Sequence, residues 1–452
     1  MSKVFSSSDS VFDWLEQFIN LERGQKPKSF RLDRMQFLCE LAGHPECCAP
    51  SIHTAGSKGK GSVTAMLAAM LTSAGYRAAR YMSPHVTNIR ERITCGDTFF
   101  DEDVYCTAGN VLREITDKIL PSASNPLFDE SAADGCQPTY FELLTLYFFL
   151  CAKYGKCDVI VAETGMGGRL DCTNVLDPLV SIITLIELEH TAFLGNTIAK
   201  IANEKAGIIK QNKPVILAEQ CSEALEVFIK IAKQKGSPLL YLPQIVKTSG
   251  VKVHNGGTNF TIVCENYSNT LSIPIPGKVQ AENAALAVTA LKTAFPQIKD
   301  DAICAGLSNL KIPGRFERIS ENPLFIIDGA HTPRSMELCT GTFCTLYGEH
   351  GVLIFGCAAD KDADAMAKIA GTQFAKIIIT TPGAFRTSRP QKVYEAFASI
   401  AGAEKTLLIE DTQEAVRVAH KLAQKNNIPV LGAGSFYLVC EIRRMIAECF
   451  YI

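Results

Sequence analysis

The sequence predicts an α/β protein made of two units, each with a mostly parallel sheet and helical crossovers. Strand-like runs alternate with helix-like segments in both halves of the chain, as expected of parallel strands joined through helices. The length of 452 residues also exceeds one ordinary domain of ~150 residues. Hydrophobic residues make up 47% of the chain, which is enough to fill two sizeable cores.

In the first half, short apolar or β-branched runs that end in polar residues predict strands of a parallel sheet. These runs span 51–56, 77–83, 158–163, 180–186 and 214–218. Helical stretches are expected between them, at 60–73, 140–153 and 221–235. The more polar interval 241–272 predicts an antiparallel meander attached to the main sheet, with strands near 251–253 and 259–263 and a helix following at 280–294.

A proline and a glycine interrupt the chain in Leu310-Lys-Ile-Pro-Gly-Arg315, as expected of a hinge between two units. We therefore predict one domain over 1–312 and a second over 313–452. The alternation of strands and helices restarts beyond the hinge and predicts a smaller, Rossmann-like α/β domain. Its strands are expected at 324–327, 352–355, 376–380, 406–409 and 429–431, and one of its helices at 412–425.

Charge and composition exclude several classes of protein. Lys and Arg number 45 against 47 Asp and Glu, a net charge of -2, which gives no support to a nucleic-acid or polybasic membrane binder. The N-terminus lacks the pattern of a signal or transit peptide, and the longest nearly apolar run, 143–152, is half of the ~20 residues of a membrane span. The 17 cysteines include no C-x-x-C pair. We expect a cytoplasmic protein whose cysteines are reduced and lie mostly in the core.

The strongest local signal is a glycine-rich run from Gly56 to Ser62, between a predicted strand and a predicted helix. In such a turn, backbone N–H groups and a helix N-terminus surround phosphate oxygens, and Lys60 adds a positive charge. The run does not match the strict motif G-x-x-x-x-G-K-[ST]. Thr54 occupies the position of the motif's first glycine, and Gly61 occupies the position of the Ser or Thr whose hydroxyl binds the metal. A strand-to-helix turn without a ligand is the alternative interpretation.

Because Gly61 offers no hydroxyl to Mg²⁺, other strand ends are needed to supply ligands. Ser83 ends one predicted strand, Glu163 stands directly before glycines at the end of another, and His190 follows an apolar run. Ligand sites in open parallel sheets gather at such carboxyl ends. A hydroxyl, a carboxylate and an imidazole can each take one position around Mg²⁺, with phosphate and water in the others.

Taken together, the motifs resemble those of the folylpolyglutamate synthase and dihydrofolate synthase family, the folate branch of the Mur ligase superfamily. The resemblance covers essentially the whole chain, and the motifs stand in the family's order. They are Arg31-Leu-Asp-Arg34, Gly56-Ser-Lys-Gly-Lys-Gly-Ser62, Ser83-Pro-His85, Glu91-Arg-Ile93, Glu163-Thr-Gly-Met-Gly-Gly-Arg-Leu-Asp-Cys-Thr-Asn174, Glu204-Lys-Ala-Gly-Ile-Ile-Lys210, Gln280 to Asn283, Pro313-Gly-Arg-Phe-Glu317, Asp328-Gly-Ala-His-Thr-Pro333, Asp360-Lys-Asp362 and Gly434-Ser-Phe-Tyr-Leu438.

The resemblance implies a P-loop-type ATPase domain that also binds pterin, followed by a glutamate-ligase domain. In this family, ATP converts a carboxylate into an acyl phosphate, which the amino group of L-glutamate attacks. The implied cofactor is Mg²⁺, as two ions, and ATP is a co-substrate; Ser83, Glu163 and His190 organise the metal. The residues implied in ATP binding are Gly56, Ser57, Lys58, Gly59, Lys60, Gly61, Ser62, Asn283, Arg315 and Asp328.

Three residues are implied as catalytic: Lys60, Lys205 and His331. On composition alone, Lys205 is typical of a solvated helix residue. The resemblance implies instead that it is carbamylated and helps to hold the second Mg²⁺, which requires a lowered lysine pKa. His331 and Ser435 are implied in positioning the glutamate, and His331 alternatively in positioning the γ-phosphate.

For the pterin, the resemblance implies three segments near the predicted strand ends. A pterin ring needs an aromatic or apolar wall and a few hydrogen-bonding groups. The implied residues are Arg31, Arg34, Thr139, Phe141, Glu142, Leu170, Asp171 and Cys172. The sequence departs from the family pattern at Lys58, where many bacterial members have Asn, at Val279 in place of His, and at Thr332 in place of Asn.

The activity expected is ligation of L-glutamate to dihydropteroate, to reduced folates, or to both, with the bifunctional form favoured by the match at 31–34. A monofunctional folylpolyglutamate synthase is the alternative. A Mur ligase acting on a cell-wall nucleotide precursor and a regulatory nucleotide-binding module are two further alternatives. We expect small-molecule substrates, no nucleic-acid or membrane partner, and a monomer.

Overall fold

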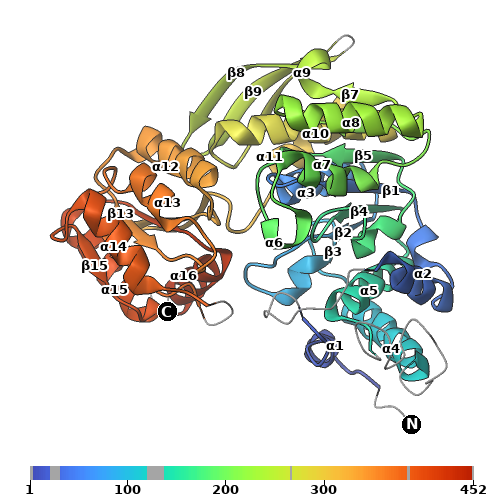
Figure 1. Ribbon diagram of the computed structural model, residues 1–452, viewed down its shortest axis with the longest axis horizontal. Helices are drawn as coiled ribbons and strands as arrows, with labels where there is room; N and C mark the ends of the chain where they lie inside the picture. Colours follow the sequence, from blue (N-terminus) through green and yellow to red (C-terminus); the bar gives the residue numbers. More distant parts are fainter. Residues whose placement is uncertain (1–3, 21–30, 120–136, 265–266, 384–386, 450–452) are drawn as a thin grey trace.

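The computed structural model describes residues 4–20, 31–119, 137–264, 267–383 and 387–449. Figure 1 shows two α/β parts, the N-terminal part in blue to yellow and the C-terminal part in orange to red. The predicted α/β class is confirmed, since each part has its own mostly parallel sheet. The predicted hinge falls in the irregular segment between α11 (Asp300–Ser308) and β11 (Glu317–Glu321).

The first sheet has seven strands in the order β3-β2-β4-β1-β5-β6-β7, and β3 runs antiparallel to β2. The strands are β1 (Ser51–Ala55), β2 (Ala78–Tyr81), β3 (Ile93–Cys95), β4 (Val159–Glu163), β5 (Val180–Ile183), β6 (Val215–Leu217) and β7 (Leu239–Tyr241). Every residue of β1 and β4 is buried, because helices cover both faces of the sheet. The five strands predicted for this half correspond to β1, β2, β4, β5 and β6.

Helices pack on both faces of this sheet. On one face lie α3 (Lys60–Ser73) and α10 (Lys278–Ala294), with α11 against α3. On the other lie α5 (Tyr140–Tyr154), α7 (Ile198–Lys205) and α8 (Ser222–Lys235). The other helices among the described residues of this part are α1 (Ser8–Leu15), α2 (Leu32–Leu41), α4 (Glu102–Ile119), α6 (Thr191–Leu194), α9 (Leu242–Ile245), η2 (Pro45–Cys47), η3 (Ile89–Arg92), η4 (Cys172–Val175) and η5 (Ala206–Ile208).

The antiparallel meander forms a sheet of its own, in the order β10-β9-β8. Its strands are β8 (Lys247–His254), β9 (Gly257–Cys264) and β10 (Tyr267–Ile273). The prediction that the meander is attached to the main sheet is therefore wrong. Phe260, Ile262 and Leu271 are buried in the cluster that also contains α10 and α11, so packing on these helices takes the place of pairing with the main sheet.

The second sheet has the order β11-β12-β16-β13-β14-β15, and β11 is antiparallel to β12. Its further strands are β12 (Leu324–Ile327), β13 (Val352–Phe355), β14 (Lys376–Ile379), β15 (Thr406–Leu408) and β16 (Val430–Ala433), which the sequence predicts. One face packs against α12 (Pro333–Tyr347), α13 (Ala363–Ala370) and α14 (Pro390–Ala401). The other face packs against α15 (Thr412–Asn426) and α16 (Phe436–Cys449).

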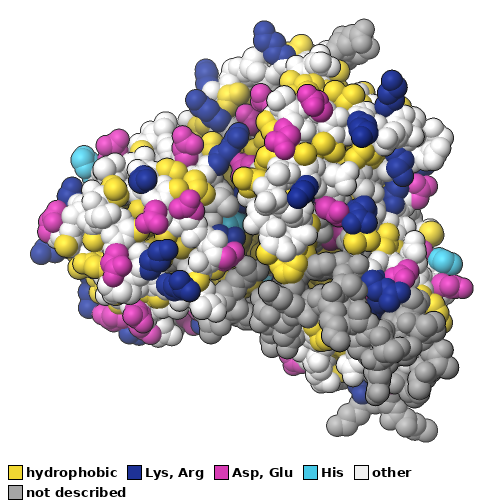
Figure 2. All heavy atoms as spheres, in the orientation of Figure 1, with side chains coloured by type: hydrophobic (Ala, Val, Ile, Leu, Met, Phe, Trp, Pro, Cys, Tyr) yellow, Lys and Arg dark blue, Asp and Glu magenta, His cyan; other side chains and the backbone are white. Residues whose placement is uncertain are grey.

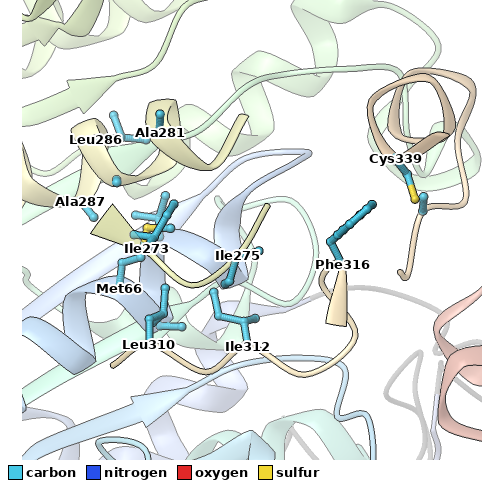
Figure 3. Packing of buried hydrophobic residues seen from close by; sticks show 14 of the residues in the cluster. Met66, Ile273, Ile275, Ala281, Leu286, Ala287, Leu310, Ile312, Phe316 and Cys339 are labelled. Atoms are coloured by element: carbon cyan, nitrogen blue, oxygen red, sulfur yellow. The ribbon is translucent and has the colours of Figure 1, made fainter. Parts of the chain in front are cut away.

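One apolar cluster runs from the first part into the second. Ile312 and Phe316, in the hinge segment, are only 8% and 7% exposed. Figure 3 shows Ile312 close to Leu310 and Ile275, with Phe316 and Cys339 beyond them. The hinge segment is therefore packed into the apolar core that the two parts share.

The cysteines whose side chains the structure describes are free, and most of them lie in a core cluster or pack against one. Six are buried: Cys39, Cys151, Cys157, Cys172, Cys339 and Cys357. Cys47, Cys48 and Cys221 are exposed, and the others are half-buried. Within the described ranges, no helix has both the length and the apolar character needed to cross a membrane.

Candidate active site

The glycine-rich turn between β1 and α3 requires glycine at two positions. A Cβ added at Gly56 would lie 1.8 Å from Thr184 Oγ1, and one at Gly59 would lie 2.5 Å from Asn283 Oδ1. Gly59 also has φ 90°, which disfavours other residues. The turn therefore packs directly against α10, and the structure brings Asn283 to the predicted phosphate loop.

Not every amide of the turn is available to a phosphate. The amides of Ser57 and Lys58 donate to the Leu185 carbonyl at 2.8 and 3.2 Å. ATP binding by Ser57 and Lys58 stays a prediction. The first turn of α3, starting at Lys60, receives no side-chain cap. A helix N-terminus in this state presents N–H groups to an anion, so the first-turn amides and Lys60 remain for phosphate.

Glu163, the last residue of β4, lies buried beside Ser83 and Lys60. Its Oε2 accepts a hydrogen bond from the Ser83 amide at 3.3 Å, and its Oε1 lies 3.9 Å from Lys60 Nζ. Burial raises the pKa of Glu163, although Lys60 acts against the shift. Lys60 Nζ donates to the Gly56 carbonyl at 3.0 Å, and its separation of 3.9 Å from Glu163 Oε1 is too long for a hydrogen bond. A buried carboxylate with so little neutralisation, next to a serine, fits the ligand set of a divalent cation.

His190 lies at the start of α6 with φ 47°, and its side chain is exposed. Its predicted partners, Ser83 and Glu163, lie at the ends of neighbouring strands β2 and β4. The described residues hold no cluster of three or more His, Cys, Asp or Glu side chains arranged for a metal ion. The three-residue magnesium set therefore stays a prediction.

Lys205, at the end of α7, is buried rather than solvated. Its Nζ donates to Glu189 Oε1 at 2.8 Å and to the Gly56 carbonyl at 2.7 Å, and the residue is 1% exposed. Burial lowers the pKa of Lys205 to about 8, which increases the neutral form that carbamylation needs. Although burial opposes the shift, Lys205 and Lys60 lower the pKa of Glu189 to about 2. The sequence reasoning missed Glu189, although it stands directly before His190.

The C-terminal part brings the two predicted residues Arg315 and Asp328 to the same region. The Arg315 guanidinium lies 4.2 Å from the centre of the Phe436 ring. Burial lowers the pKa of Arg315, although the charges of Asp328 and Glu163 act against this shift. Asp328 accepts hydrogen bonds from the Phe316 and Ala330 amides, both at 2.8 Å. Arg315 therefore faces carboxylates from both parts of the molecule.

His331 is neutral in this site. Its Nδ1 donates to the Gly329 carbonyl at 2.7 Å, because a carbonyl oxygen only accepts. Burial and the charge of Lys58 lower the pKa of His331 to about 3, so Nε2 keeps its lone pair at neutral pH. Ser435 caps α16 by accepting from the Tyr437 amide at 3.2 Å. Its predicted contact with glutamate stays a prediction.

Further charged residues face one another between the two parts, where Figure 2 shows a hollow in the surface. Arg334 Nε lies 3.4 Å from Glu187 Oε1 across this boundary. Burial is the main reason why the pKa values of Lys58 and His331 are lowered. The charge of nearby Lys361 lowers both pKa values further. The sequence reasoning missed Glu187 and Arg334, and it quoted Lys361 only as part of a motif.

Three predicted pterin residues hold one another in place. Arg34 Nε lies 3.1 Å from Glu142 Oε1, and the Arg34 side chain is 2% exposed. Thr139 and Glu142 form the capping box that starts α5. Arg31 pairs with Asp33 through its Nη2 at 2.6 Å. These contacts are structural, and pterin binding by these residues stays a prediction.

The other pterin candidates line the loop after β4. Phe141 lies against Gly165, where an added Cβ would be 2.3 Å from its Cζ. Asp171 is buried and accepts from the Met166 amide at 2.9 Å and from Thr173 Oγ1 at 2.5 Å. Leu170 is half-buried, and Cys172 packs in the core beneath. The structure thus brings an aromatic ring and a buried carboxylate to one loop.

His53 of β1 supports Asp171 through Thr173 and predicts a pH effect on stability. Its Nε2 lies 2.7 Å from Thr173 Oγ1, and burial lowers its pKa to about 3. The unfolded chain therefore binds one more proton between pH 6.5 and 3. The contribution is fully present above pH 6.5 and falls by about 1.4 kcal/mol per pH unit as the pH drops through this window.

We expect His53→Gln to reduce the slope of unfolding free energy against pH by about 1.4 kcal/mol per unit between pH 5.5 and 4.5. Urea unfolding at several pH values measures this slope. The exposed His350 provides the control, and His350→Gln should leave the slope unchanged. Equal slopes for His53→Gln and the unmodified protein would contradict the account of His53.

Two family models match the chain. The Mur ligase middle domain matches residues 113–291, and the Mur ligase glutamate ligase domain matches residues 314–436.

Relatives match over nearly the whole length. The chain is 30% identical to the dihydrofolate synthase/folylpolyglutamate synthase of Bacillus subtilis, over 98% of this chain and 100% of that protein. It is also 30% identical to the folylpolyglutamate synthase of Lacticaseibacillus casei, over 91% and 94% of the two chains. The structure of Mycobacterium tuberculosis folylpolyglutamate synthase complexed with ADP and AMPPCP is similar with a TM-score of 0.86 and 26% identity, covering 98% and 99%.

Proposed function

Because the chain belongs to the Mur ligase family of folylpolyglutamate synthases and dihydrofolate synthases, we propose that it ligates L-glutamate to dihydropteroate and to reduced folates with ATP. The observation that supports this proposal is the pairing of Lys60 and Glu163 at the first sheet with Arg315 from the hinge. These groups suit phosphoryl transfer, where catalysis is mainly positioning and charge stabilisation.

In the proposed reaction, a carboxylate oxygen of the folate substrate attacks the γ-phosphorus of ATP, and ADP leaves. The amine of L-glutamate, having lost a proton, then attacks the acyl carbon, and phosphate leaves with the former carboxylate oxygen. Lys60 and the first-turn amides of α3 hold the phosphates, and Arg315 stabilises the charge on the transferred group. His331, neutral with a free Nε2 lone pair, orients the incoming amino acid.

We propose that Ser83, Glu163 and His190 hold Mg²⁺ and that carbamylated Lys205 holds a second ion. When bound, magnesium neutralises phosphate charge and orders the phosphate oxygens. The buried Glu163 carboxylate supports this assignment, because Lys60, 3.9 Å away, compensates its charge only in part. Glu189 holds the unmodified Lys205 beside the Gly56 carbonyl.

The relatives named above include proteins with one and with both folate activities, so the acceptor range needs an assay. Purified protein is given Mg-ATP, radiolabelled L-glutamate and, in turn, dihydropteroate, tetrahydrofolate or a muramyl nucleotide. The bifunctional proposal predicts label in both folate products. Label with tetrahydrofolate alone would make the enzyme a monofunctional folylpolyglutamate synthase, and label in the muramyl product alone would overturn the proposal. We further propose a cytoplasmic monomer, since both halves of the site come from one chain.

A further inference from the structure

The connection between β2 and η3 carries Ser83 and packs against α16 of the C-terminal part. Val86, in this connection, is 5% exposed and belongs to an apolar cluster whose other buried members lie between 325 and 446. Cys440 Sγ lies 4.0 Å from the His85 carbonyl oxygen. Figure 1 shows this light-blue segment on the side of the N-terminal part that faces α16. The connection is thus built into the core of the other part.

Glu91 makes the connection rigid from within. Its Oε2 accepts from the Val86 amide at 2.7 Å, and its Oε1 accepts from the Thr87 and Asn88 amides at 3.0 Å each. Three amides on one carboxylate fix the backbone between Val86 and Asn88. A displacement of Val86 or Thr87 therefore also displaces Ser83, which stands three residues before Val86. The Ser83 amide donates a hydrogen bond to Glu163.

A chain of polar contacts joins the hinge to this connection. Glu317 accepts from the Gly314 amide through Oε2 at 2.8 Å and from Arg443 Nε through Oε1 at 3.1 Å. Arg443 also donates through Nη1 to Thr87 Oγ1. A Cβ added at Gly314 would lie 3.3 Å from Val86, so the hinge touches the connection directly as well.

Helix α16 therefore contacts two catalytic elements at once. Through Phe436 it supports the Arg315 guanidinium, and through Arg443 it holds Thr87 in the Ser83 connection. We propose that Arg443 is a positioning residue. It couples the position of Arg315, in the hinge, to the position of Ser83. This inference rests on the proposed function, in which Ser83 and Arg315 serve the same ATP. Since small displacements of catalytic groups cost about 100-fold in rate, such a link has a measurable effect.

The first test measures the connection without nucleotide or metal. In the full chain, Arg443→Ala should speed hydrogen exchange of the Val86, Thr87 and Asn88 amides by about 10-fold, because their anchor on α16 is lost. The exposed neighbour Arg444 gives the matched control, and Arg444→Ala should leave these rates unchanged. Unchanged exchange in Arg443→Ala would overturn the proposal.

The second test measures nucleotide binding. Arg443→Ala should raise by about 10-fold the Mg²⁺ concentration needed for half-maximal binding of a fluorescent non-hydrolysable ATP analogue, with a melting temperature near that of the unmodified protein. Thr87→Val should act in the same direction, and the double variant should be no worse than Arg443→Ala alone. Additive effects would show that Arg443 does not act through Thr87, and an unchanged Mg²⁺ requirement would show that Arg443 does not position Ser83; either result would overturn the proposal.

The two tests separate this inference from the proposed function. If the unmodified protein transfers no glutamate while both effects of Arg443→Ala appear, the proposed activity fails and the link stands. If ligation occurs and neither effect appears, the link fails and the activity stands.

Discussion

Replacing Glu163 by glutamine is expected to lower kcat/KM for ATP-dependent glutamate ligation by about 1,000-fold or more. The substitution removes the negative charge next to Lys60 and Ser83, where the proposed site holds the metal on the phosphates. The fold should persist, since burial already raises the pKa of this carboxyl and a neutral amide of the same shape is less costly to bury. Initial rates with Mg-ATP, dihydropteroate and L-glutamate measure the effect.

A surface carboxylate gives the control for this experiment. Glu414 lies on α15, its side chain is 51% exposed, and its ion pair with Arg417 spans 3.8 Å. Glu414→Gln should change kcat/KM by less than about 2-fold, because exposed ion pairs contribute little. A Glu163→Gln enzyme with nearly normal turnover would remove Glu163 from the mechanism.

Replacing Lys205 by alanine is the second change with a large expected effect, a loss of about 1,000-fold in turnover. It removes the proposed carbamate and also leaves Glu189 without its 2.8 Å partner. Lys205→Arg separates these two roles, since arginine keeps a positive charge for Glu189 but does not form the carbamate. The account predicts that Lys205→Arg is also inactive, at a melting temperature that shows it is folded.

Chemical rescue gives the positive result for the same residue. The space left in Lys205→Ala should admit acetate, whose carboxylate stands in for the carbamate, so millimolar acetate should restore part of the turnover. Acetate should not activate Glu163→Gln. Full activity of Lys205→Arg without additive would show that a positive charge paired with Glu189 is sufficient.

The strands were predictable where a continuous apolar run met a polar residue, as in β4 before Glu163. β11 was not, because its sequence Glu-Arg-Ile-Ser-Glu is polar and it is a strand only through pairing with β12. The attachment of the meander was also beyond reach. Its strands alternate in the same way whether they extend a sheet or cover α10 and α11.

The site residues, like the strands, were predictable from local sequence patterns but not where their position depends on distant contacts. Local signals predicted the glycine turn and the strand-end residues Ser83 and Glu163. Contacts between residues far apart in the sequence could not be predicted. One example is the hydrogen bond between Lys205 and Gly56, which are 149 positions apart. Glu189 gains its role only from its own hydrogen bond with Lys205, 16 positions further along the chain. The hydrogen bonds from the loop amides to Leu185 were missed for the same reason, since the acceptor lies just after β5, far along the chain.

The central claim is that this enzyme activates the folate carboxylate as an acyl phosphate. The most direct measurement supplies dihydropteroate with ¹⁸O in its carboxylate, together with Mg-ATP and L-glutamate, and analyses the released phosphate by mass spectrometry. The account predicts one ¹⁸O atom in phosphate for each amide bond formed. Amide formation that leaves the phosphate free of ¹⁸O would contradict it.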